Sequence, residues 1–221
     1  MVEMIELPLF PLNTVLFPGM PLGLHIFEDR YKLMIDKCIQ ERRPFGVVLI
    51  KSGTEALGPV AEPHPVGCIA YVTQVQRLEQ GRLNIGAMGH ERFQILELDD
   101  SLPYLVGQVE KYPLDEGEPE AINRAARRLR PWVIRYLEAI PKGGDEEEEL
   151  DLEQVSDEPI PLAYLAATLL QIPPDEKQPL LATKDASTLL GELRALYRRE
   201  VALVKSMLEQ AVEDQGSFSL N

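Results

Sequence analysis

The chain has 221 residues, of which 45% are hydrophobic and 26% charged, and its formal net charge is −14. These proportions are typical of a globular protein with one large or two small domains, and they exclude a disordered or fibrous chain. No run of about 18 apolar residues is present, and Glu3 and Glu6 stand where a signal peptide has its basic region, so we expect a cytoplasmic protein with no membrane partner.

Residues 1–115 are predicted to form a β-rich subdomain, because short runs of β-branched and aliphatic residues alternate with Gly and Pro. The expected strands cover residues 4–9, 21–26, 45–50, 67–78, 82–88, 93–98 and 104–112. The unbroken apolar run 47–50 indicates a strand buried on both faces or in a barrel wall, and Gln80-Gly81 indicates a hairpin turn. A sheet of this size hides its edges best by closing, so we predict a partly closed β-barrel.

One helix is expected within this subdomain, after Ile26. Its apolar residues recur every three or four positions and therefore share one face: Phe27, Tyr31, Met34, Ile35, Cys38 and Ile39. Pro44 and Gly46 end this helix. Cys38 and Cys68 form no C-x-x-C pair, and we expect both to be buried, unreactive thiols.

Residues 116–221 are predicted to form an α-helical subdomain. A first helix covers residues 120–140, with a kink expected at Pro131. A short helix then spans 162–170 and ends at Pro173-Pro174, and a further turn of helix covers 177–182. Asp185 is expected to cap a last, long helix. Its apolar stripe is interpreted as core and comprises Leu189, Leu193, Leu196, Tyr197, Val201, Val204, Leu208 and Ala211.

Charge is unevenly distributed in the helical half. Residues 142–158 hold nine Asp and Glu against Lys142, a net charge of −8, and have the composition of a loop. The preceding helix carries the basic residues Arg124, Arg127, Arg128, Arg130 and Arg135. We interpret these as a solvated, partly self-neutralising surface, with an RNA site or a site for an acidic partner as the alternatives. The overall acidic balance argues against nucleic acid as a partner.

The sequence contains no recognisable machinery for catalysis or for cofactor binding. His25, His64 and His90 stand singly, without metal-ligand spacing. The glycines form no phosphate-binding loop, and no G-x-S-x-G elbow is present. We therefore predict no catalytic residue, no cofactor and no metal, and a non-catalytic binding module.

Several motifs resemble those of one known family. The first is the run Leu-Pro-Leu-Phe-Pro-Leu-Asn-Thr-Val-Leu-Phe-Pro-Gly at residues 7–19, which continues into residues 21–31. Residues 45–50, 67–70 with 80–83, 89–95 and 177–181 then follow in family order. Together these closely resemble the N-terminal domain of Lon proteases, over nearly the whole chain. The acidic residues 145–149 depart from the family pattern.

The resemblance implies an α+β fold, with an N-terminal PUA-like, partly closed β-barrel carrying one helix and a C-terminal α-helical bundle. It implies a module that binds unfolded or specific polypeptides, as an adaptor to a protease or chaperone, without the ATPase and Ser-Lys protease domains of Lon. RNA binding and hydrolysis are the alternative functions. The predicted contact residues lie between positions 17 and 30 and are Phe17, Met20, Glu28, Asp29 and Arg30. The competing interpretation places Phe17 and Met20 in the core and pairs the charged residues with one another.

Overall fold

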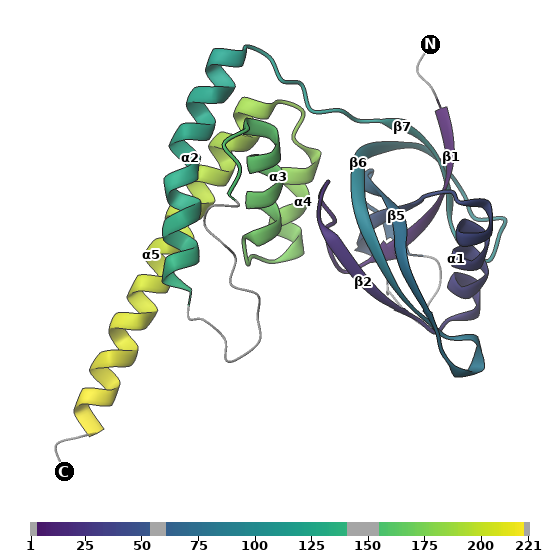
Figure 1. Ribbon diagram of the computed structural model, residues 1–221, viewed down its shortest axis with the longest axis horizontal. Helices are drawn as coiled ribbons and strands as arrows, with labels where there is room; N and C mark the ends of the chain where they lie inside the picture. Colours follow the sequence, from purple (N-terminus) through teal and green to yellow (C-terminus); the bar gives the residue numbers. More distant parts are fainter. Residues whose placement is uncertain (1–3, 54–60, 141–154, 219–221) are drawn as a thin grey trace. The chain divides into compact units, whose positions relative to one another are not determined.

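A computed structural model describes residues 4–53, 61–140 and 155–218. The chain forms two compact units, which we call the barrel unit (Met1–Leu114 and Ala167–Lys184) and the helical unit (Asp115–Ala166 and Asp185–Asn221). The predicted acidic loop 142–158 lies outside the described residues, apart from its last four positions. The α+β class is confirmed, since strands dominate the barrel unit and helices form the other unit (Figure 1).

The described part of the barrel unit contains seven strands, most of them in antiparallel pairs. In chain order they are β1 (Met4–Leu12), β2 (Pro21–Ile26), β3 (Phe45–Ser52), β4 (Glu62–Pro63), β5 (Val66–Arg77), β6 (Leu83–Asp99) and β7 (Val106–Lys111). Gln80 and Gly81, both with positive φ, turn β5 into β6, which confirms the predicted hairpin. The sequence predicted two strands where β6 is one, because residues 89–92 carry no apolar alternation.

The predicted partly closed barrel is confirmed. β1 pairs with β7 through its first half and, in parallel, with β3 through its second half, so the order β1-β7-β6-β5-β3 returns on itself. β6 is shared along its length, because its first half pairs with β2 and its second half with β7. Among the described strands β2 pairs with β6 alone, and the barrel is open beside it.

Two apolar clusters fill the barrel unit, one on each face of β3. Val47 contributes to the cluster that also contains the buried face of α1 (Asp29–Glu41), and Val48 contributes to the cluster around Phe93. β3 is therefore buried on both faces, as its unbroken apolar run predicted. The Phe93 ring lies so close to Gly46 and Gly67 that a Cβ at either position would come within 2.7 Å of Cζ. Only glycine fits at these two positions.

A helix from the second half of the sequence belongs to the barrel unit. The boundary predicted between residues 115 and 116 placed residues 167–184 in the helical subdomain. In the structure, α4 (Pro174–Ala182) packs on the barrel. Buried Arg92 of β6 donates hydrogen bonds from Nη1 to the carbonyl oxygens of Leu181 and Thr183. Gln178 Nε2 donates to the Val66 carbonyl oxygen at 3.0 Å. These polar contacts attach the helix to β5 and β6.

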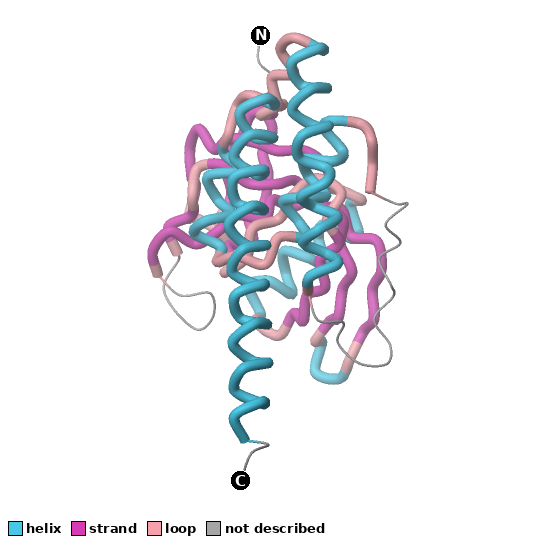
Figure 2. Tube along the Cα trace, turned by 90° about the vertical axis from the view of Figure 1, so that its left-hand side faces the viewer, coloured by secondary structure: helices cyan, strands magenta, loops and turns pink. Residues whose placement is uncertain are grey.

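The helical unit consists of α2 (Pro119–Ala139), most of α3 (Pro159–Leu169) and α5 (Ala186–Phe218). α2 and α5 lie side by side in Figure 2. α2 continues through Pro131 as one helix. Asp185 caps α5 as predicted, because its Oδ1 accepts a hydrogen bond from the Thr188 N–H at 2.6 Å.

The apolar stripe of α5 is core only in its first four turns. Leu189, Leu193, Tyr197 and Val201 are buried, as predicted. Leu208, predicted to be core, is exposed, together with Leu203 and Met207. The reason is visible in Figure 1, where α5 extends beyond the end of α2 that covers it. Ala211 lies among side chains that the structure does not describe.

Both cysteines are buried in the barrel unit, and this predicts an alkaline loss of stability. Burial raises the pKa of Cys38 from 9.0 to about 11 and that of Cys68 to about 12. Above pH 9 the unfolded thiols lose protons that the folded thiols retain, so the free energy of unfolding falls as the pH rises. We expect a slope of about 1.4 kcal/mol per pH unit for each thiol.

Urea unfolding below pH 9 and near pH 11 measures this slope of the free energy of unfolding against pH. The Cys38→Ala/Cys68→Ala variant should show a shallower slope. Equal slopes would contradict this expectation.

Candidate functional site

The segment predicted to contact a partner begins with a turn that buries Phe17. The Met20 N–H donates to the Phe17 carbonyl oxygen at 3.0 Å, across Pro18 and Gly19, and Gly19 has a φ of +80°. Proline followed by a positive-φ glycine favours a type II turn. Phe17 is fully buried and Met20 is half-buried against the core cluster of α1. Phe17 therefore does not form part of a contact surface, because a buried ring is not available to a partner.

The three charged residues of the prediction are paired locally. Arg30 Nη2 lies 2.9 Å from Glu28 Oε2, and both side chains are largely buried. The Arg30 guanidinium also lies over the Tyr31 ring, 4.7 Å from its centroid. Asp29 is exposed and pairs with Lys32 at 3.0 Å. Glu28 and Arg30 are thus paired with each other at the start of α1.

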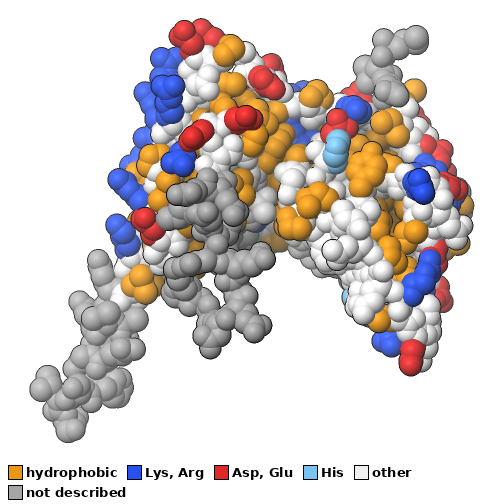
Figure 3. All heavy atoms as spheres, in the orientation of Figure 1, with side chains coloured by type: hydrophobic (Ala, Val, Ile, Leu, Met, Phe, Trp, Pro, Cys, Tyr) orange, Lys and Arg blue, Asp and Glu red, His pale blue; other side chains and the backbone are white. Residues whose placement is uncertain are grey.

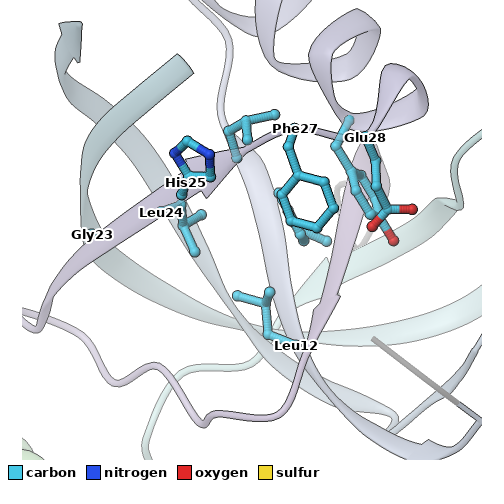
Figure 4. A pocket seen from close by; sticks show the side chains of 9 residues that line it. Leu12, Gly23, Leu24, His25, Phe27 and Glu28 are labelled. Carbon is cyan, nitrogen blue, oxygen red and sulfur yellow. The ribbon is translucent and has the colours of Figure 1, made fainter. Parts of the chain in front are cut away.

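The same segment nevertheless borders a cleft of about 260 Å³. It lies between β1, β2 and the start of α1, and its lining residues are Phe10, Leu12, Gly23, Leu24, His25, Ile26, Phe27, Glu28 and Tyr31. In Figure 4 the side chains of Leu12, Leu24 and Phe27 surround one common space. Phe10 and Tyr31 stack with their centroids 4.1 Å apart. Most of the lining residues are apolar, and His25, Glu28 and Tyr31 contribute polar groups.

Phe27 lies outside the helix to which its spacing assigned it. Its spacing put it on the buried face of the predicted helix, but α1 begins at Asp29 and Glu28 is its N-cap. Phe27 precedes the helix and is 47% exposed. An exposed phenylalanine beside a cleft with apolar lining residues is a candidate contact for a partner.

The edge of β2 beside the cleft is unpaired among the described strands. Leu22, Leu24 and Ile26 face inward, while Pro21, Gly23 and His25 face outward, as expected of a strand with alternating faces. A Cβ at Gly23 would meet no atom within 4 Å, so the outer face of the strand is also open there. An open strand edge offers backbone donors and acceptors to an added strand.

Exposed apolar side chains continue on the outer face of the same strands. Pro21 is in register with Met88, which is in register with Tyr71. All three are exposed, and His90 packs against Tyr71 with centroids 5.5 Å apart. Figure 3 shows hydrophobic side chains exposed over the barrel unit. Both faces of β2 therefore adjoin apolar surface.

The cleft is suited to binding and not to nucleophilic chemistry. None of its lining residues is a serine, threonine, cysteine or lysine. His25 Nδ1 is 2.6 Å from Asn84 Oδ1, and Glu28 is held by Arg30. The volume lies just below the roughly 300 Å³ at which small-molecule sites begin, which suits one or two large side chains. Within the described residues, no group of three or more His, Cys, Asp or Glu is placed to hold a metal ion.

Comparison with known proteins identifies the family. The model of the ATP-dependent protease La (LON) substrate-binding domain matches residues 6–197. The chain belongs to this family. It is 27% identical over 218 residues to the Lon protease of Anaeromyxobacter dehalogenans, covering 96% of this chain and 25% of that protein. It is 26% identical to the Lon protease of Phenylobacterium zucineum, covering 94% and 26%. The chain thus spans about a quarter of the length of these Lon proteases.

Solved structures of LON N-terminal domains share the fold. The Lon N-terminal domain protein from Xanthomonas campestris aligns with a TM-score of 0.59 and 26% identity, covering 86% of this chain and 98% of that chain. The N-terminal domain of the Mycobacterium avium complex Lon protease aligns with a TM-score of 0.69 and 20% identity, covering 88% and 98%. The LON resemblance expected from residues 7–31 is therefore confirmed. None of the helices in the described part of the chain is long and apolar enough to cross a membrane.

Proposed function

We propose that this LON substrate-binding domain binds extended, apolar polypeptide segments in the cleft beside β2. The observation that carries the proposal is the juxtaposition of an apolar cleft, an exposed Phe27 and an unpaired strand edge. A peptide added along β2 would gain backbone hydrogen bonds irrespective of its sequence. Its alternate side chains would enter the cleft, which selects for apolar residues.

The proposed role is capture without catalysis. Unfolded polypeptides expose both apolar side chains and unpaired backbone, which are the two features that this site complements. The captured segment is then passed to a protease or a chaperone, carried on the same chain or on a separate one. Membership of the LON substrate-binding family supports this assignment.

Two substitutions in the cleft should weaken peptide binding. Leu24→Ser/Phe27→Ser removes apolar surface that a bound side chain would cover, and burying one such side chain contributes about 1.5 to 3 kcal/mol. We expect the dissociation constant to rise by roughly tenfold to a hundredfold. Fluorescence anisotropy with a labelled, permanently unfolded model protein measures this change.

The matched control is Leu33→Ser on α1, since Leu33 is 55% exposed and lies outside the cleft. This variant should bind as the natural chain does. A second comparison uses an apolar peptide and the same peptide with N-methylated backbone amides, which should bind more weakly if β2 pairs with it. Equal affinity of the Leu24/Phe27 double variant and the Leu33 variant would refute the cleft as the site.

A further inference from the structure

The exposed face of α2 in the helical unit carries a row of arginines. Arg124, Arg128 and Arg135 lie on one side of the helix at intervals of four and seven residues, with Arg127 beside them. All four are exposed. Figure 3 shows Lys and Arg side chains gathered along one rim of this unit. A positive face on a chain of net charge −14 is a local feature of this unit.

α5 adds to the same face at Trp132. The guanidinium carbon of Arg135 lies 4.8 Å from the centroid of the Trp132 ring, and that of Arg198 lies 5.5 Å from it. Arg198 comes from α5, so arginines of two neighbouring helices meet at one indole. We call Arg124, Arg127, Arg128, Arg135 and Arg198 the arginine face.

No member of the arginine face forms an ion pair with another described residue. The neighbouring arginines differ in this respect, because Arg199 pairs with Glu200 at 2.7 Å and Arg130 pairs with Asp157 at 2.9 Å. Like charges at this spacing repel one another. An anionic partner would relieve that repulsion.

Arg130, a half-buried arginine of the same helix outside this face, illustrates the contacts that an arginine makes with an acidic segment of the chain. Its Nε contacts the Asp157 carboxylate, and its Nη2 donates to the Val155 carbonyl oxygen at 3.4 Å. One guanidinium thus holds both a carboxylate and the backbone of a polypeptide segment. The fork geometry of arginine favours such two-pronged contacts over those of lysine.

We propose that the arginine face is a docking surface for an acidic polypeptide segment, separate from the peptide cleft of the barrel unit. Residues 124 to 135 span about 17 Å along the helix axis at 1.5 Å per residue. That length matches about five residues of extended chain at 3.3 Å each. A short run of Asp and Glu therefore complements the face in both charge and length.

Two observations favour a polypeptide over a nucleic acid. Binding of single strands relies on aromatic rings that are free to stack with bases, whereas Trp132 is already engaged by two guanidinium groups. The net charge of −14 also opposes a long polyanion, whose phosphates extend beyond the face. A compact acidic segment meets only the positive surface.

Charge reversal tests the proposal in the full chain. A fluorescently labelled Glu-rich peptide is titrated at low ionic strength, and the single Trp132 supplies an intrinsic fluorescence signal at the site. We expect Arg124→Glu/Arg128→Glu/Arg135→Glu to weaken binding about tenfold or more. Added salt should weaken binding to the natural chain, because the contacts are exposed.

The matched control reverses the same number of charges on the barrel unit, as Lys37→Glu/Arg77→Glu/Arg82→Glu. Circular dichroism establishes that both triple variants are folded. Because residues 145–149 are themselves acidic, the titration is repeated with these five changed to Asn and Gln, so that competition within the chain does not hide binding. No binding by either form, equal weakening in both triple variants, or tighter binding of a single-stranded oligonucleotide of equal charge would overturn the proposal.

Discussion

Arg92→Met is expected to lower the free energy of unfolding by about 3 to 5 kcal/mol. Arg92 is buried, and its guanidinium binds the carbonyl oxygens of Leu181 and Thr183, at the end of α4. The last carbonyls of a helix have no partner within the helix, and a cation also favours that end of the helix dipole. Methionine retains much of the apolar stem but leaves these carbonyls unsatisfied.

The measurement is urea unfolding followed by circular dichroism, with hydrogen exchange to locate the effect. Exchange should accelerate first in α4 and at the start of β5, where Gln178 binds the Val66 carbonyl. Arg77→Met is the matched control, because Arg77 is 62% exposed and its ion pair with Asp36 contributes less than about 1 kcal/mol. Equal loss in the two variants would show that Arg92 does not hold α4.

The contacts of Arg92 also show what the sequence cannot reveal. The strands on either side of Arg92 and a turn of helix at residues 177–182 were predicted from local patterns. The hydrogen bond from Arg92 to Leu181, however, joins positions 89 residues apart. Nothing in the periodicity of either segment indicates that pairing. For that reason the predicted boundary between the two subdomains assigned residues 167–184 to the helical one. Their contacts place them with the barrel.

Local signals succeeded where burial alone determines the structure. The apolar run at residues 47–50 predicted β3 because its two faces pack in two different clusters. The cap at Asp185 and the turn at Gln80-Gly81 were predicted because each depends on adjacent backbone geometry. Such features need no knowledge of distant partners.

The sequence predicted the segment that borders the cleft, but not which of its side chains line the cleft. Residues 17–30 do border the cleft, but of the five side chains predicted to contact a partner Phe17 is buried, and Glu28, Asp29 and Arg30 are paired locally. Of the predicted residues only Glu28 lines the cleft, together with Leu24 and Phe27, which the sequence did not single out as contact residues. The three- and four-residue spacing assigned Phe27 to a helix that begins two residues later. Spacing indicates which residues share a face, but not where the helix begins.

Tyr197 should be as important for the stability of the helical unit as Arg92 is for that of the barrel unit. It lies on α5 and is fully buried, its ring packs edge-on against Tyr136 of α2 with centroids 5.2 Å apart, and its hydroxyl donates to the Ala166 carbonyl of α3 at 2.8 Å. One side chain thus joins the three helices described for this unit. Tyr197→Ala leaves a cavity and is expected to cost about 3 to 5 kcal/mol.

Tyr197→Phe separates the contribution of the hydroxyl from that of the ring, because it removes only the hydrogen bond to Ala166 and should cost about 1 to 3 kcal/mol. The fluorescence of Trp132 on α2 reports unfolding of this unit directly, since the chain has one tryptophan. Leu203→Ala is the control on the same helix, because Leu203 is 51% exposed and its loss should change stability by less than about 0.5 kcal/mol. If Tyr197→Ala were no more destabilising than Leu203→Ala, α5 would not depend on this contact for its packing, and Tyr197 could not be what joins the three helices.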